Sequence, residues 1–131
     1  MRVGEGGNYS IDLDAGVATL RVWRRPDLTF DEGARLAVMI LDDVRRISAR
    51  TDARGFVMDL REAPALTGKR TRATLAEIVG VFEAAKKPIS VLLAQGVQHA
   101  TLTTPLSASG PTTARFFTEP DTARAWAAGI D

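Results

Sequence analysis

The segment from residue 61 to residue 72, here called the cationic segment, holds the side chains best suited to binding an anion. Its only acidic residue is Glu62, and its four cationic residues are Arg61, Lys69, Arg70 and Arg72. It follows a short apolar stretch typical of a buried strand and leads into a predicted helix, which is where open α/β sheets place ligands. Backbone amides at a helix N-terminus also favour anions. We therefore expect an anion or a partner to bind there.

Hydroxyl groups and a glycine complete this predicted site. The full candidate set is Arg61, Thr67, Gly68, Lys69, Arg70, Thr71 and Arg72. An ordinary loop is the competing interpretation, in which Gly68 shapes a turn, Thr71 caps the helix and the cations are solvated. The stretch is not a nucleotide-binding P-loop, because that motif needs glycine where Ala63 stands and serine or threonine where Arg70 stands.

Other residues with chemical potential are better explained by surface or packing roles. His99 is the single histidine, and no serine or acid stands at the spacing of a catalytic triad around it. Asp42 and Asp43 are adjacent on a predicted helix, so their carboxylates point apart and are expected to be solvated. The run from Trp23 to Pro26 joins an aromatic ring to two arginines, but packing at a strand end explains it. We expect no enzyme active site.

Composition narrows the functional classes further. The 131 residues are 45% hydrophobic and 25% charged, which is typical of one globular domain, expected at residues 8–131 after a flexible segment at residues 1–7. Without cysteine and with one histidine, we expect no metal and no cofactor. A net charge of +1 gives no reason to expect nucleic acid. Neither a signal peptide nor a stretch of ~18 apolar residues is visible, which predicts a cytoplasmic protein without stable membrane insertion.

The first third of the chain predicts a β-hairpin and a helix. Side chains alternate between apolar and polar in Tyr9–Leu13, and a turn at Asp14–Gly16 precedes a second predicted strand at Val17–Trp23, which makes the two a hairpin. Thr29 and Glu32 have the spacing of a capping box, which starts a helix that ends near Arg50. The apolar positions of this helix recur every three or four residues, as in a helix that covers a sheet.

Helices and strands alternate in the rest of the chain. After a buried strand at Phe56–Leu60, the polar stretch that ends at Arg70 leads into a predicted helix, which ends at Lys86 and Lys87 before Pro88. We then predict a buried strand at Ile89–Ala94, a short helix within Val97–Ala108, a strand at Ala114–Phe117 and a terminal helix capped by Thr118. This order predicts an α/β fold, with a mixed sheet of about five strands and about four helices.

The order of elements and three segments together resemble the SpoIIAA-like group of STAS (sulfate transporter and anti-sigma factor antagonist) domains. The segments are Gly55–Leu60, Thr74–Val79 and Ala114–Trp126, within a likeness that extends from about Tyr9 to Ala128. In the antagonists that name the family, a partner kinase phosphorylates a serine in the loop after the corresponding strand. Thr67, before Gly68, stands in that place here and is the candidate phosphoacceptor. The surrounding cations suit an anion better than a switch that adds negative charge.

Two functions are expected from these features. The resemblance implies a non-enzymatic regulatory or protein-interaction module, self-associating as a homodimer and lacking the usual phosphoserine switch. The alternative is a small-molecule binding protein, in which the cations and amides of the cationic segment hold an anionic or amphiphilic ligand at the strand ends. Val38 and Met39, which lie off the main apolar stripe of the first helix, favour a covered protein surface. A pocket lined by Thr67, Lys69 and Arg72 under an apolar wall would favour the ligand.

Overall fold

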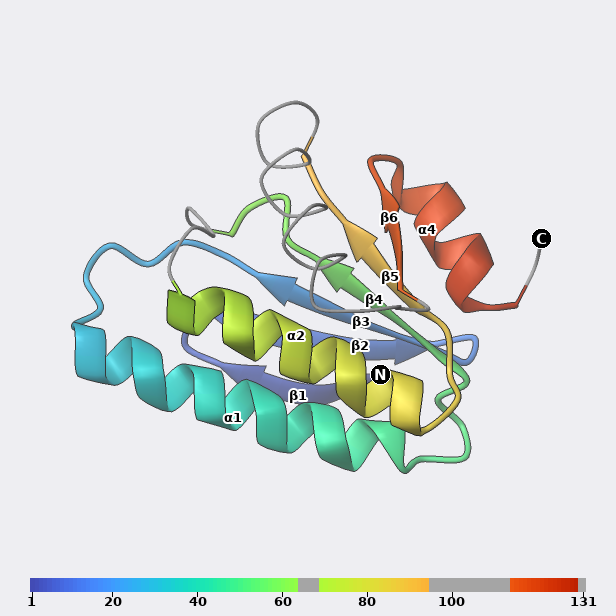
Figure 1. Ribbon diagram of the computed structural model, residues 1–131, viewed down its shortest axis with the longest axis horizontal. Coiled ribbons are helices and arrows are strands. Elements are labelled where there is room, and N and C mark those ends of the chain that lie inside the picture. Colours follow the sequence, from blue (N-terminus) through green and yellow to red (C-terminus); the bar gives the residue numbers. More distant parts are fainter. Residues whose placement is uncertain (64–68, 95–113, 130–131) are drawn as a thin grey trace.

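In the computed structural model, which describes residues 1–63, 69–94 and 114–129, helices cover both faces of a six-stranded sheet (Figure 1). For residues 69–71 it describes the backbone alone. The strands lie side by side in chain order: β1 (Arg2–Gly6), β2 (Tyr9–Asp14), β3 (Val17–Val22), β4 (Gly55–Asp59), β5 (Ile89–Leu92) and β6 (Arg115–Phe117). The described helices are α1 (Phe30–Ser48), α2 (Lys69–Ala84) and α4 (Pro120–Ala127).

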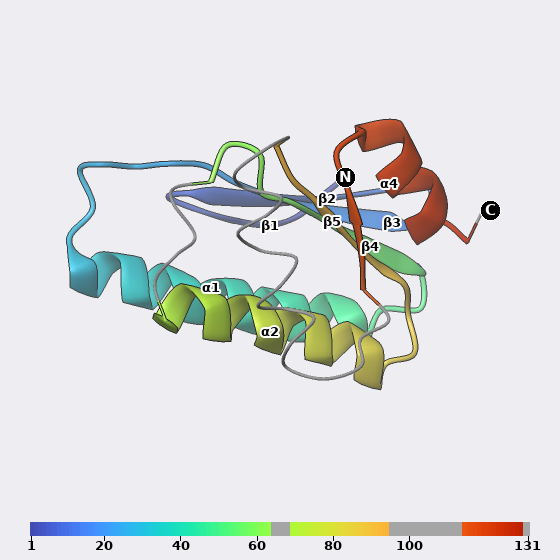
Figure 2. The same cartoon turned by 45° about the horizontal axis from the view of Figure 1, so that its top comes forward.

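The two halves of the sheet differ in strand direction. Strands β1, β2 and β3 pair antiparallel, whereas β3, β4, β5 and β6 pair parallel. Helices α1 and α2 connect parallel strands and lie together on one face, and α4 lies on the other face (Figure 2). The predicted α/β class and mixed sheet are thereby confirmed. The carboxyl ends of β3 and β4 consequently share one edge of the sheet, next to the N-terminal ends of α1 and α2.

The sheet has one more strand than predicted. Residues 2–6, expected to belong to a flexible segment, form the edge strand β1 against β2. The Arg2 guanidinium donates to Asp12 Oδ1 at 2.8 Å, and the Met1 ammonium group donates to the Leu13 carbonyl oxygen at 3.0 Å. Residues far along the chain thus hold this strand in place, and its own glycine-rich sequence is a weak strand signal. For both reasons the strand is not predicted from the sequence. The helix predicted within Val97–Ala108 lies outside the described residues.

Helix caps agree with the sequence at one end of the chain and differ at the other. Thr29 Oγ1 accepts the Glu32 amide at 3.1 Å, and Glu32 Oε1 accepts the Thr29 amide at 3.2 Å, which confirms the capping box. The prediction that Thr118 caps the last helix is wrong, because Glu119 is the N-cap and makes no side-chain cap bond. Pro120 in the first turn fixes this start, since its missing N–H group needs no partner there. Among the described helices, none has the length and apolar composition to cross a membrane.

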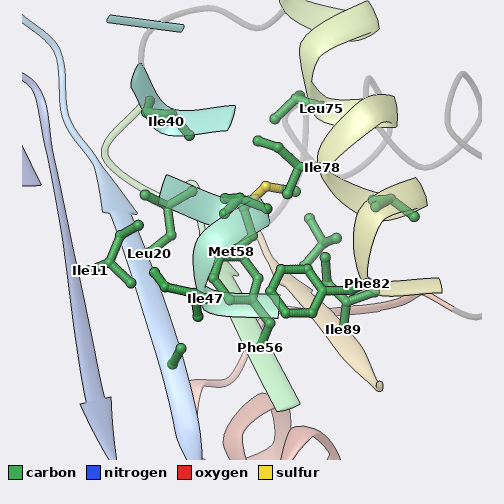
Figure 3. Packing of buried hydrophobic residues seen from close by; sticks show 14 of the residues in the cluster. Ile11, Leu20, Ile40, Ile47, Phe56, Met58, Leu75, Ile78, Phe82 and Ile89 are labelled. Atoms are coloured by element: carbon green, nitrogen blue, oxygen red, sulfur yellow. The ribbon is translucent and has the colours of Figure 1, made fainter. Parts of the chain in front are cut away.

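The main core lies between the sheet and the two long helices (Figure 3). Phe56 of β4 stacks on Phe82 of α2 with ring centroids 4.3 Å apart, and both side chains are fully buried. Every residue of β4 is buried, as predicted, because its alternate side chains enter two cores. A second, smaller core lies under α4 and contains Val17, Val57, Leu92, Ala123 and Ala127.

Gly55 sets how closely α4 approaches the sheet. A Cβ atom at this position would lie 1.7 Å from the Ala127 carbonyl oxygen, and backbone atoms cannot move aside cheaply. We expect Gly55→Ala to lower the free energy of unfolding by about 1 to 3 kcal/mol. Gly80→Ala is the matched control, since nothing lies within 4 Å of its added Cβ. In α2 it should raise stability by about 0.5 to 1 kcal/mol. Urea unfolding measures both, and equal effects would contradict the close α4 contact.

Candidate functional site

A cavity of about 640 Å³ lies between the sheet and the two long helices, at the edge where β3 and β4 end. Residues from β3, β4, the first half of α1, the first half of α2 and the β3–α1 loop line it. Its volume falls within the range of about 300 to 1,000 Å³ that holds drug-sized ligands. The position is the one where open α/β sheets bind ligands.

Small side chains on α1 create this space. Gly33, Ala34 and Ala37 face the cavity from successive turns of the helix. The larger Ile40, one turn further on, also lines the cavity and belongs to the main core. The loop at residues 23–29 spans from the end of β3 to the start of α1, as the blue trace in Figure 2 shows. It closes the end of the cavity with side chains that include Trp23 and Leu28. The small side chains in this part of α1 therefore leave the space between the helix and the sheet unfilled.

The inner wall of the cavity is apolar. Leu20 and Met58 project from neighbouring strands and are fully buried. Leu60 follows β4 and Ile78 lies on the facing side of α2, each with only 1–2% of its surface exposed. Such a wall stabilises hydrocarbon by removing it from water and offers nothing to compensate a buried charge. A charged part of any ligand must therefore stay at the rim.

Some polar side chains of the cavity wall have hydrogen-bond partners within the fold, and others do not. Arg25 donates to Asp27 Oδ1 at 3.0 Å and to the Gly7 carbonyl oxygen at 3.1 Å, and its guanidinium lowers the pKa of the Asp27 carboxyl group. Thr29 is engaged in the capping box of α1. Arg24, by contrast, is exposed and makes no hydrogen bond or ion pair with any residue that the structure describes. Its guanidinium remains available to an anion at the rim.

Only part of the cationic segment is described. Thr67 and Gly68, the candidate phosphoacceptor and its neighbour, lie outside the described residues. The backbone of Lys69, Arg70 and Thr71 forms the first turn of α2, so this helix starts slightly before its predicted position. Their side chains also lie outside the described part of the chain. Of the seven candidate residues, Arg61 and Arg72 are the two with described side chains, and neither is among the described residues that line the cavity.

Arg61 is already paired within the fold. Its Nε and Nη2 atoms donate to the two Asp59 oxygens at 3.0 and 2.9 Å, and this pairing raises the pKa of the arginine. Asp59 is buried at the end of β4, so removing Arg61 would leave its carboxylate without this partner. Arg72, in contrast, is exposed on α2. The geometry therefore gives Arg61 a structural contact and leaves Arg72 open to solvent.

Asp43 has a structural role that the sequence does not reveal. The Tyr9 hydroxyl group donates to its Oδ2 at 2.7 Å, and Arg46 donates to its Oδ1 at 2.7 Å. Burial and the Asp43 carboxylate raise the pKa of Tyr9. The expectation that Asp43 is merely solvated is wrong, because β2 places Tyr9 under α1, where its hydroxyl group contacts Asp43. Asp42 is exposed, as expected. Within the described residues, no group of three or more acidic or histidine side chains could hold a metal ion.

Sequence reasoning missed the residues that form the cavity. Asn8 lies in the turn before β2, and Trp23 and Arg24 follow β3, so only the paired strands bring them together. A usable signal was present in the small residues Gly33, Ala34 and Ala37 on the inner side of α1, where larger apolar side chains would normally fill the core.

The site is thus an apolar cavity at the strand ends. Among its described lining residues, one cationic side chain, Arg24, has no hydrogen-bond or ion-pair partner. Its apolar lining, with a few polar groups, has the usual character of a small-molecule site. The resemblance to STAS domains remains a prediction from the sequence. Comparison of the chain with models of protein families, with curated proteins and with solved structures finds no match in any of the three.

Proposed function

We propose that the protein binds an amphiphilic small molecule, with the apolar chain in the cavity and an anionic head group at its rim. The observation that carries the proposal is the 640 Å³ apolar cavity at the carboxyl ends of β3 and β4. The lining of this space is mostly apolar, and an acyl chain bound there would remove that apolar surface from water. This function has the ligand class of the small-molecule alternative expected from the sequence, but the described lining includes Arg24 and the β3–α1 loop and none of the described side chains of the cationic segment.

Charge at the rim favours an anionic head group. Arg24 lines the cavity and has no described partner. The first turn of α2 holds no acidic residue, so the partial positive charge of its N-terminus is not offset there. Lys69 and Arg70 add positive charge to that turn by sequence. The first turn of α1 does hold Asp31 and Glu32, but neither is among the described residues that line the cavity.

Fluorescence of Trp23 provides the test, because this ring lines the cavity. The only other tryptophan, Trp126 of α4, packs against Phe117 of β6. The substitution Trp126→Phe removes its fluorescence and leaves Trp23 as the single source of signal. Three ligands with the same 12-carbon chain are titrated below their micelle concentrations: dodecanoate, 1-dodecanol and dodecyltrimethylammonium. We expect a saturable blue shift, with dodecanoate binding most tightly. No saturable change with any of the three would overturn the proposal.

Arg24→Ala tests the head group separately from the chain. We expect this change to weaken dodecanoate binding roughly fivefold, as the loss of one exposed ion pair, and to leave 1-dodecanol binding unchanged. Arg45→Ala is the control, since Arg45 is equally cationic but lies in the last turn of α1. Equal weakening of both ligands, or the same loss in the control, would show that Arg24 does not contact the head group.

A protein partner is the second candidate function, favoured by one observation. Val38 and Met39 of α1 are 58% and 44% exposed, although both are large and apolar. A second copy of this chain could cover them, as the predicted homodimer requires. Sedimentation equilibrium reports this directly: a dimer in the wild type that is lost in Val38→Lys would support the candidate, and a monomer would remove it.

A further inference from the structure

The outer face of α1 combines two exposed apolar side chains with a regular pattern of charge. Val38 and Met39 are exposed near the middle of the helix, which runs along one side of the molecule next to α2 (Figure 1). Covering such side chains removes apolar surface from water and so favours a partner. The charges around them indicate which partner fits.

The exposed charged residues of α1 are placed symmetrically about the point between Val38 and Met39, with opposite signs at equal distances. On the N-terminal side of this point the nearest charge is basic and the two at the helix end are acidic. On the C-terminal side the nearest charge is acidic and the two at the helix end are basic. In chain order these residues are Asp31, Glu32, Arg35, Asp42, Arg45 and Arg46. The helix is therefore complementary in charge to a second copy that runs in the opposite direction.

The inner pair of charges, Arg35 and Asp42, is not explained by the needs of the single chain. Helix dipoles favour acidic residues in the first turn and basic residues in the last, which accounts for the ends of α1 but not for this pair. Arg35 makes no hydrogen bond or ion pair with any residue in the described part of the chain. Asp42 has an exposed ion pair with Arg45 at 3.7 Å. Both side chains are therefore accessible to a partner.

We propose that the protein forms a homodimer in which α1 packs antiparallel against α1 of a second copy. The two-fold axis passes between Val38 and Met39, so that Arg35 of each copy lies opposite Asp42 of the other. A crossing angle of about 20° keeps the helices close enough for the acidic end of each to meet the basic end of the other. A parallel pair would instead place every charge opposite its own copy.

This inference rests on the second candidate function, a protein partner, and specifies the surface and the orientation of the two copies. It does not depend on ligand binding. The cavity and the proposed interface use opposite sides of α1, since Ala34 and Ala37 line the cavity from the inner side whereas Val38 and Met39 are exposed.

Exchanging the charges of the inner pair tests the surface and the orientation together. In a homodimer, Arg35→Glu places acidic residues opposite each other, and Asp42→Arg places basic residues opposite each other. Each variant alone should dimerise roughly thirtyfold more weakly than the wild type, because two symmetry-related pairs change from attraction to repulsion. In an equimolar mixture the variants complement each other, and we expect a heterodimer about as stable as the wild-type dimer.

Sedimentation equilibrium in low salt, at protein concentrations up to about 0.5 mM, compares the wild type, the two variants and their mixture. Arg72→Glu is the matched control, since it makes the same change of charge at an exposed position of α2. Its dimer should be as stable as that of the wild type. All the variants should keep the wild-type circular dichroism spectrum, because the substituted side chains are exposed.

The outcomes separate this inference from the function on which it rests. Two weakened variants, a mixture restored to wild-type affinity and an unchanged control support the inference. A wild type that stays monomeric at the highest concentration overturns both the inference and the protein-partner function, and leaves the ligand-binding function standing. A wild-type dimer overturns the inference alone if the mixture binds no more tightly than the separate variants, or if the control loses as much affinity as Arg35→Glu.

Discussion

Phe82→Ala is expected to lower the free energy of unfolding by about 3 to 5 kcal/mol, because it removes a fully buried ring from the main core. The ring stacks on Phe56 at a centroid separation of 4.3 Å with planes 15° apart, so the substitution also removes an aromatic contact (Figure 3). Phe82 lies on α2 and Phe56 on β4. The pair therefore joins the helix to the sheet.

Urea unfolding followed by far-ultraviolet circular dichroism measures this loss. Val38→Ala is the control, since Val38 lies 58% exposed on α1, and its effect should stay within about 0.5 kcal/mol. Phe82→Leu, which keeps most of the buried volume, should fall between the two. A loss below about 1 kcal/mol for Phe82→Ala would contradict the packing of α2 on β4.

Ala37→Trp is expected to weaken dodecanoate binding at least hundredfold by filling the cavity. Ala37 faces the cavity from the middle of α1, so an indole ring placed there occupies space proposed for the acyl chain. Displacing about four methylene groups from an apolar site costs roughly 3 kcal/mol, or more than a factor of 100 in affinity. Because the ring enters existing space, the fold should tolerate it better than a substitution in a filled core.

The control for this prediction is Ala84→Trp, which places the same ring on an exposed position of α2. Isothermal titration calorimetry with dodecanoate compares the two variants and avoids the added tryptophan signal. We expect the control to bind as the wild type does, and both variants to keep melting temperatures within a few degrees of the wild type. Full dodecanoate affinity in a folded Ala37→Trp protein would place the ligand outside the cavity.

Local sequence signals predicted most of the fold. The capping box of Thr29 and Glu32 marks the start of α1 because it needs only contacts three residues apart. The unbroken apolar run in β4 reflects burial on both faces. Strand β1 was missed because its support comes from partners far along the chain, such as Asp12 for Arg2. The start of α4 was misplaced because Thr118 favours a cap by type, while the proline in the first turn sets the position.

The candidate site was less predictable than the fold. The sequence directed attention to a cluster of charges, but Arg61 from that cluster pairs with Asp59. The cavity exists because Gly33, Ala34 and Ala37 have small side chains or none. It also depends on the register of the sheet, which brings Asn8 beside Trp23. The small residues of α1 are a local signal of missing side-chain volume, whereas the register that joins Asn8 to Trp23 depends on residues far apart in the sequence. The edge of the sheet was therefore identified, but its lining was not.

The position of bound dodecanoate can be measured by nuclear magnetic resonance with protein labelled at its methyl groups. We expect intermolecular NOEs from the acyl chain to Met58 and Ile78, which line the cavity, and none to Val17 and Leu92 in the second core under α4. That pattern would place the chain between the sheet and the two long helices. NOEs to the exposed Val38, or to the second core instead of the cavity, would contradict the proposed site.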